Sequence, residues 1–180
     1  CMLIRAKLFK ENEGFDPYFF AHMEEVDLCW RLKNQGYRLA IVPNSKVYHV
    51  GGGTLPKSNP FKTYLNFRNN LLLLYKNLPE ENLNKLLFIR MLMDGVSAVL
   101  FLISFKFKDI SAIFKAHNSF KKKKNEYTQF RVDQMKKHGF PKHEETYERS
   151  LVVDYFIAGH RTFSKLRNDF GIRMDKKIIE

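Results

Sequence analysis

Three carboxylates stand within four successive positions of this 180-residue chain, at Glu24, Glu25 and Asp27. The surrounding pattern predicts a helix from about residue 23 to residue 35, so these side chains occupy its first turn. At about 100° per residue, Glu24 and Asp27 share a helical face with Arg31, and Asp27 can pair with Arg31 four positions later. Glu25 points well away from that face and is left free for other work.

Glu25 lies near the positive end of the dipole of this predicted helix. That field favours the ionised carboxylate, which suits a general base that must accept a proton. The position also has a purely structural explanation, because acidic residues stabilise helix starts whether or not they do chemistry. The local sequence leaves both interpretations open.

His49 is a second candidate, because it lies near the end of a predicted strand and just before the glycines at positions 51–53. In open α/β sheets ligands gather at the carboxyl ends of strands, and glycines there let the backbone approach a phosphate closely. A lone histidine is more often a surface residue, and glycines can serve only to make a turn. The arrangement is compatible with a ligand site without requiring one.

The elements expected around these candidates belong to an α/β fold. Apolar runs and helix-stop glycines predict strands at residues 1–4, 37–42 and 46–50, and helices at residues 7–13 and 23–35. This order of strands and helices is typical of an α/β sheet rather than of a helical bundle.

The second half of the chain is predicted to be helical, with no comparable strand signal after residue 50. The expected helices lie at residues 61–76, 86–105 and 109–120. Pro56 and Pro60 bracket a polar linker between the two halves. We therefore expect one domain portion at residues 1–58 and a helical region at residues 59–180.

The charge is strongly basic, with a formal net charge of +12. Residues 106–180 carry 18 Lys and Arg against 10 Asp and Glu, including four lysines in a row at 121–124. Such a balance favours anionic partners, among them nucleic acid, an anionic membrane and phosphorylated substrates. Two cysteines, Cys1 and Cys29, suggest neither a disulfide framework nor a zinc site, so a cytoplasmic setting fits best.

The carboxylates at residues 24–27 and the segment of His49 with its following glycines together resemble motifs of family 2 of the glycosyltransferases. The resemblance covers roughly residues 1–80, and its order and spacing match the acceptor-side motifs of that family. Its motifs are Gly14-Phe15-Asp16-Pro17-Tyr18-Phe19-Phe20, Glu24-Glu25-Val26-Asp27-Leu28-Cys29-Trp30-Arg31, Gly36-Tyr37, Pro43, Val47-Tyr48-His49-Val50-Gly51-Gly52, the helix from Lys62 to Asn70, and Lys76-Asn77.

The resemblance implies a fold and a set of roles. The fold would be the acceptor-side half of a GT-A, Rossmann-like catalytic domain, followed by a mostly helical C-terminal region. Glu25 would be the catalytic base, at a position where many members have aspartate, with Glu24 and Asp27 beside it. His49 would help to bind Mg²⁺ or Mn²⁺. The substrate-binding residues would be Arg31, Gly51, Gly52, Arg68 and Lys76.

The implied reaction is a single displacement with inversion, from a nucleotide-sugar donor to a glycan or lipid-linked acceptor in bacterial cell-surface polysaccharide synthesis. The Asp-x-Asp motif that supplies the other metal ligand in this family is absent from the chain. We therefore expect the chain to be the second half of a catalytic domain, and to be inactive alone.

Two other classes of function compete with this interpretation. Aromatic residues interleave with the basic tail at Phe120, Tyr127, Phe130 and Phe140, as in a non-catalytic membrane- or nucleic-acid-binding module. No nucleic-acid fold motif accompanies them, so nucleic acid is not the expected partner. A metal-dependent hydrolase built on the same acids lacks a second histidine at ligand spacing.

The apolar segment at residues 86–105 is expected to lie on an anionic membrane rather than to cross it. Its length would allow crossing, but Arg90 and Asp94 interrupt it, and each would cost about 2.5–3.5 kcal/mol at the bilayer centre. Nearby lysines would each contribute about 1 kcal/mol at an anionic surface. This predicts a cytoplasmic protein, peripheral at the inner face of the plasma membrane. A core helix is the alternative.

Overall fold

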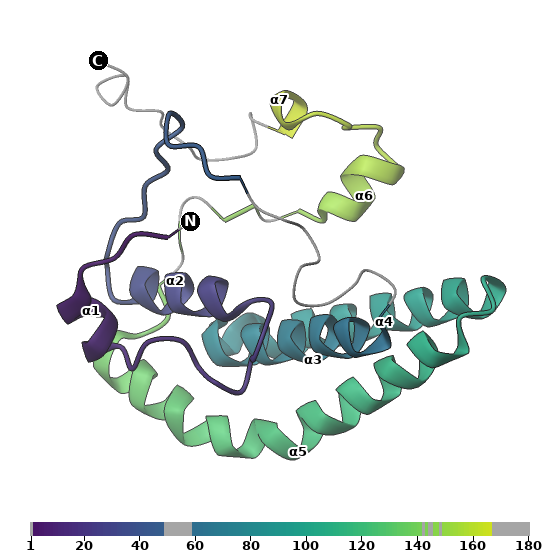
Figure 1. Ribbon diagram of the computed structural model, residues 1–180, viewed down its shortest axis with the longest axis horizontal. Coiled ribbons are helices and arrows are strands. Elements are labelled where there is room, and N and C mark those ends of the chain that lie inside the picture. The colour runs from purple at the N-terminus through teal and green to yellow at the C-terminus, as the bar shows by residue number, and fades with distance from the viewer. Residues whose placement is uncertain (1, 49–58, 142, 144–145, 148, 167–180) are drawn as a thin grey trace. The chain divides into compact units, whose positions relative to one another are not determined.

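The computed structural model describes residues 2–48, 59–141, 143, 146–147 and 149–166, and all of its regular elements are helices. They are α1 (Ala6–Glu11), α2 (Glu24–Asn34), α3 (Pro60–Asn77), α4 (Glu80–Ile103), α5 (Phe107–His138), α6 (Leu151–Phe156) and α7 (Phe163–Leu166). The chain divides into two compact units, residues 1–140 and residues 141–180. The helices of the first unit carry the candidate site (Figure 1).

The α/β prediction is wrong for the described residues, which contain no strand. Residues 37–42 and 45–48 have no regular structure, and their apolar side chains lie in solvent, with Ile41 90% and Tyr48 98% exposed. The start of the chain is similar, because Leu3 is 99% exposed. A strand is stable only when its backbone groups pair with a neighbouring strand, and no described segment pairs with these.

The core of the first unit forms around α3. The helix begins with Pro60 at its first position, and the side chain of Asn59 accepts a hydrogen bond from the backbone N–H of Phe61. Its apolar stripe includes the fully buried Leu65 and Leu72. The buried cluster consists of Phe19, Leu71, Leu72, Leu73, Leu78, Leu83, Leu87 and Phe120. Side chains from α3, α4, α5 and the segment before α2 therefore meet in one core.

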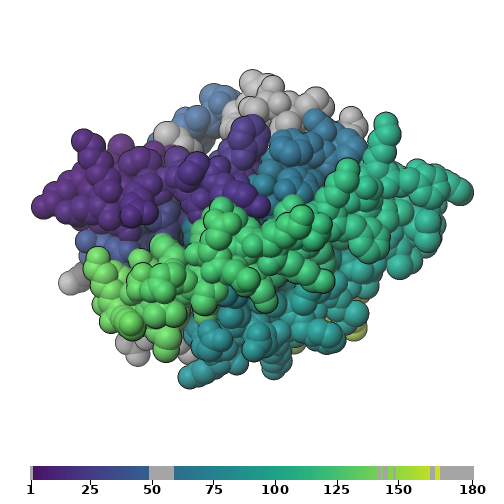
Figure 2. Space-filling view, turned by 90° about the horizontal axis from the view of Figure 1, so that it is seen from below, coloured from purple at the N-terminus to yellow at the C-terminus, as the bar shows by residue number. Residues whose placement is uncertain are grey.

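α5 packs along α3 and extends well beyond the predicted range of 109–120. Small buried residues, Ala112 and Ala116, allow the two helices to approach closely. Figure 2 shows α5 as a continuous band between the purple N-terminal segment and the teal α4. Helix α2 also packs on α3, which brings the predicted carboxylates against the central helix.

The second unit is small and is organised around Asp154 in α6. Its carboxylate, 1% exposed, accepts hydrogen bonds from the hydroxyl of Tyr147 and the guanidinium of Arg149. Ser150 caps the helix by accepting from the N–H of Val153. The predicted division at 58/59 stays a prediction, since residues 49–58 lie outside the described part.

Candidate active site

The three predicted carboxylates lie in the first turn of α2 but in different surroundings. Asp27 is fully buried, Glu24 is half-buried and Glu25 is exposed. The helix ends as predicted at Gly36, whose φ is 86°. The N–H of Gly36 donates to Lys33 and that of Tyr37 donates to Leu32, which is the Schellman arrangement.

Asp27 is held entirely by groups of the protein. One carboxylate oxygen accepts from the guanidinium of Arg31 at 2.9 Å and from the ammonium of Lys76 at 3.0 Å. The other oxygen accepts from the side-chain amide of Asn77 at 3.0 Å. The predicted pairing of Asp27 with Arg31 is therefore confirmed, and the Asp27 carboxylate is buried away from solvent.

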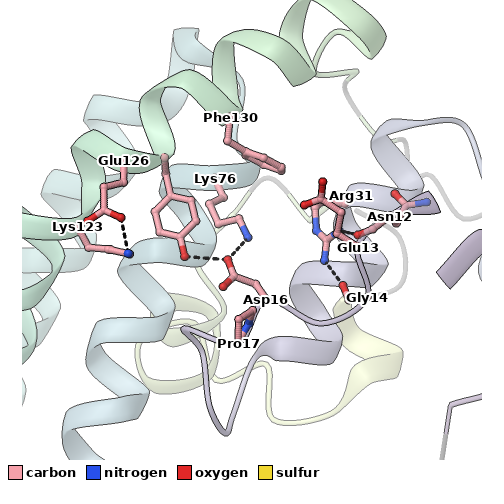
Figure 3. Close-up of a pocket in the computed structure, with 11 residues that line it drawn as sticks. Asn12, Glu13, Gly14, Asp16, Pro17, Arg31, Lys76, Lys123, Glu126 and Phe130 are labelled. Atoms are coloured by element: carbon pink, nitrogen blue, oxygen red, sulfur yellow. Dashed lines mark hydrogen bonds and ion pairs between the residues drawn. The ribbon is translucent and has the colours of Figure 1, made fainter. Parts of the chain in front are cut away.

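Lys76 joins Asp27 to a second carboxylate, Asp16. Its ammonium donates to Asp16 at 2.7 Å, and the hydroxyl of Tyr127 donates to the same oxygen at 2.8 Å (Figure 3). The Lys76 side chain is 2% exposed. The rings of Phe19, Tyr127 and Phe130 lie 5.0–5.1 Å from its nitrogen. These contacts stabilise a buried cation through ion pairs and aromatic faces.

Burial alone would raise the pKa of Asp16, but its partners act in the opposite direction. The charge and hydrogen bond of Lys76, with hydrogen bonds from Tyr127 and the backbone N–H of Tyr18, hold the pKa of Asp16 below its ordinary value of 3.8. A carboxyl whose pKa is lower in the folded chain stabilises the fold above its unfolded pKa. That contribution is lost as the pH falls through the folded value.

We therefore expect Asp16→Asn to lower the free energy of unfolding at pH 6 and to matter progressively less as the pH falls below about 4. Urea unfolding of both proteins at pH 6, 5, 4 and 3 measures the difference. A difference that stays constant over this range would contradict the proposed ion pair.

Three side chains that were predicted to bind substrate instead contact the protein. Arg31 is 7%, Arg68 6% and Lys76 2% exposed. Arg31 donates to the backbone carbonyls of Asn12 and Gly14 at 2.6 and 2.7 Å. Arg68 donates to the carbonyl of Tyr18 at 2.6 Å and lies over the ring of the same residue. Their positions support the segment before α2, and a direct role in substrate binding stays a prediction.

The residues leading into Glu24 adopt a strained backbone. Phe20, His22 and Met23 have φ values of 62°, 68° and 76°, a region that side-chain-bearing residues rarely occupy. The side-chain amide of Asn69 lies 2.7–2.9 Å from the carbonyls of Phe19, Ala21 and His22. Such strain persists only where surrounding contacts enforce it, and it concentrates at functional sites.

Two buried polar atoms that belong to residues shortly before Glu25 have no hydrogen-bond partner in the described protein. They are Nε2 of His22 and Oε2 of Glu24. Most buried polar atoms are satisfied, so unpaired ones next to a strained turn are compatible with a ligand site. The nearby thiol of Cys29 is not an activated nucleophile, because burial and then the charge of Glu25 raise its pKa.

A polar cavity of about 290 Å³ lies beside the Asp16 network. Figure 3 shows Asp16, Lys76 and Arg31 lining it together with Lys123 and Glu126 of α5. The cations that border it deepest are already paired with carboxylates or carbonyls. The cavity therefore has little free charge to attract an anion.

The predicted metal and glycine positions His49, Gly51 and Gly52 lie outside the described residues. Within the part that the structure describes, no three histidine, cysteine or acidic side chains gather as a metal centre would require. These residues alone do not fit a bound Mg²⁺ or Mn²⁺.

Comparison with known proteins adds one partial match. The chain is 41% identical over 49 residues to the N-acetylglucosaminyl-diphospho-decaprenol L-rhamnosyltransferase of Mycobacterium tuberculosis, in each of two strains. Part of the chain resembles a glycosyltransferase. The match covers 27% of this chain and 16% of the relative. No family model and no solved structure matches the chain.

The sequence alone did not identify Asp16, Asn69, Asn77 and Tyr127 as parts of this network. A signal existed for one of them, because Asn69 lies on the same inward stripe of α3 as Leu65 and Leu72. A polar residue on such a stripe must find a buried partner. Asp16 and Tyr127 are 111 positions apart, and no local pattern links them.

Proposed function

We propose that this chain is part of an inverting glycosyltransferase that transfers a sugar from a nucleotide-sugar donor to a glycan or lipid-linked acceptor in cell-surface polysaccharide synthesis. The observation that carries the proposal is the different burial of two carboxylates in the first turn of α2. Asp27 is buried and fully paired, whereas Glu25, two residues earlier, is exposed in the first turn. The partial match to a rhamnosyltransferase supports the same class.

In this proposal Glu25 is the general base. It accepts the proton of the acceptor hydroxyl while that oxygen attacks the anomeric carbon, and the nucleoside diphosphate leaves from the opposite face. Such proton transfer contributes about a hundredfold to ten-thousandfold to the rate. Asp27 acts through structure, because it ties α2 to α3 and to Asp16 through Lys76.

A divalent cation, Mg²⁺ or Mn²⁺, belongs to this proposal as the partner of the donor diphosphate, where it would supply Lewis-acid stabilisation. His49 is its proposed ligand from this chain. The described residues do not form the rest of such a site, so the role of Glu25 is argued without the metal.

The experiment that tests the proposal is a transfer assay with the full-length protein that contains this chain. Labelled nucleotide sugars are offered with membranes that hold lipid-linked acceptors, and the product is analysed for anomeric configuration. We expect transfer with inversion from one nucleotide sugar. Retention of configuration, or hydrolysis without transfer to any acceptor, would contradict the proposed mechanism.

We further propose that the protein docks on an anionic membrane through α4. This helix is the one described element long and apolar enough to cross a membrane, and only 11% of its apolar window is buried. Arg90 and Asp94 do not face outward together: Asp94 is 1% exposed, pairs with Arg90 at 2.7 Å and meets His117 of α5 at 2.8 Å. The outward face of α4 is apolar and bears the exposed side chains of Leu92, Val96, Val99, Leu100 and Ile103.

Flotation with liposomes tests this docking. We expect recovery with anionic liposomes at low salt, less recovery at high salt, and less when Lys121–Lys124 become glutamine, because each lysine near an anionic surface contributes about 1 kcal/mol. Neutral liposomes are the control. Equal recovery of the wild-type chain and the glutamine variant would contradict the proposed electrostatic contribution of the lysines. No binding to anionic liposomes at low salt would contradict the whole docking proposal.

A further inference from the structure

A second cavity, of about 530 Å³, lies between the first turns of α3 and the N-terminal half of α5. We call it the α3–α5 cavity. Its lining includes Phe61 and Tyr64 from α3, and Lys108, Lys115, Asn118 and Ser119 from α5. The volume falls within the range of sites for small ligands.

The charge of the α3–α5 cavity is positive and uncompensated by its own lining. Lys108 and Lys115 lie seven positions apart on α5, and none of the described residues that line the cavity is acidic. The nearest acid in sequence, Asp109, accepts a hydrogen bond from Thr63 at 2.5 Å. Two lysines with amide and hydroxyl donors beside them suit a phosphate or diphosphate group.

The aromatic wall of the cavity contacts the segment that precedes α2 in sequence. Phe61 and Tyr64 stack with their ring centroids 5.7 Å apart, and Phe20 meets Phe61 at 6.1 Å. Phe20 belongs to the strained segment that runs into Glu24 and Glu25. An aromatic surface of this kind packs well against the face of a sugar ring that carries C–H groups, because both surfaces are apolar.

The lysine side of the cavity leads towards the proposed membrane face. Lys108 directly follows Phe107, which is 60% exposed, and the adjoining Phe105 is 80% exposed. Both aromatic side chains lie at the turn between α4 and α5, next to the apolar surface of α4. An apolar chain attached to a phosphate at Lys108 could therefore remain in the lipid.

We propose that the α3–α5 cavity binds the phosphate or diphosphate group of a lipid-linked acceptor, whose lipid lies along the α4–α5 turn and whose sugar lies against Phe61 and Tyr64. The proposal rests on the proposed transferase function and names its acceptor class and acceptor site. The surface is apolar at the α4–α5 turn, cationic at Lys108 and Lys115, and aromatic at Phe61 and Tyr64, which matches the order of lipid, phosphate and sugar in such an acceptor. A nucleoside diphosphate could also bind the two lysines, but it has no apolar chain that would contact the α4–α5 turn.

Isothermal titration of the 180-residue chain tests this site with three probes: farnesyl diphosphate, inorganic diphosphate and UDP. We expect farnesyl diphosphate to bind most tightly. Replacing both cavity lysines, as K108Q/K115Q, is expected to weaken its binding at least about tenfold, since it removes both cationic hydrogen-bond donors to the diphosphate. The matched control K136Q/K137Q removes the same charge from exposed positions on the same helix and is expected to change binding less than about twofold.

Equal weakening of farnesyl diphosphate binding in both double variants would overturn the proposal. It would mean that only the net charge of the chain matters, and not the position of the two cavity lysines. UDP binding as tightly as farnesyl diphosphate, through the same two lysines, would overturn it in favour of a nucleotide. The test is separate from the catalytic assignment, because binding is measured without turnover. If Glu25→Gln keeps full transferase activity while K108Q/K115Q loses farnesyl diphosphate, the base is misassigned and the cavity proposal stands.

Discussion

Glu25→Gln in the full-length protein is expected, from the general-base role that we propose for Glu25, to lower turnover by about a hundredfold or more while the chain stays folded. The amide keeps the size of the carboxylate but accepts no proton at neutral pH. The side chain is exposed, so its replacement removes no core contact. The turnover number and the Michaelis constant are measured together, because loss of a base lowers the former and leaves substrate binding nearly unchanged.

Two neighbours provide matched controls for this measurement. Glu24→Gln changes the adjacent carboxylate in the same helical turn, and Asp27→Asn changes the buried one. Near-normal turnover in Glu25→Gln, together with a large loss in Glu24→Gln at unchanged stability, would assign the base to Glu24. If the loss of turnover in Asp27→Asn is explained by its loss of stability, the role of Asp27 is structural and Glu25 remains the proposed base.

Asp27→Ala is expected to destabilise the chain by about 3–5 kcal/mol, because it leaves Arg31 and Lys76 as buried cations with fewer partners. Native domains are stable by about 5–15 kcal/mol, so the variant should lose a large share of the stability of the fold. Urea unfolding followed by circular dichroism measures the loss. The site is fully buried, and both cations are less than a tenth exposed.

Glu25→Ala is the control for stability, because it removes an exposed carboxylate from the same turn and should change the free energy of unfolding by no more than about 0.5 kcal/mol. A decrease in the free energy of unfolding below about 1 kcal/mol in Asp27→Ala would mean that water or another acidic residue replaces Asp27 as the partner of Arg31 and Lys76. In that case the network would not be what holds α2 against α3.

The helices were the predictable part of the fold, because their signals are local. Gly36 ends α2 through a positive φ that glycine adopts without strain, and Pro60 begins α3 at the one position where its missing N–H is harmless. The length of α5 was not predictable from apolar spacing. Its four lysines hide the periodicity, although Tyr127 and Arg131 continue the face that packs on α3.

The predicted strands are not observed because strand formation, unlike helix formation, depends on distant parts of the chain. Residues 37–42 are apolar and β-branched enough to suggest a strand, but that pattern reports only a preference. Whether a strand forms depends on a partner elsewhere, and the described residues supply none. The same limit applies to the site. The bond from Asp27 to Arg31 spans four positions and was predictable, whereas the bond from Asp27 to Lys76 spans 49 and was not.

The single amide of Asn69 beneath the carbonyls of Phe19, Ala21 and His22 has a consequence for how the site comes into being. The segment has local backbone hydrogen bonds, such as the one from the N–H of Phe20 to the carbonyl of Pro17, but its three left-handed residues are costly, so we expect it to need the contact with α3 to keep its shape. The approach to Glu25 therefore depends on tertiary contact. A peptide of residues 12–34 would contain Glu24, Glu25 and Asp27 and yet lack the group that shapes their surroundings.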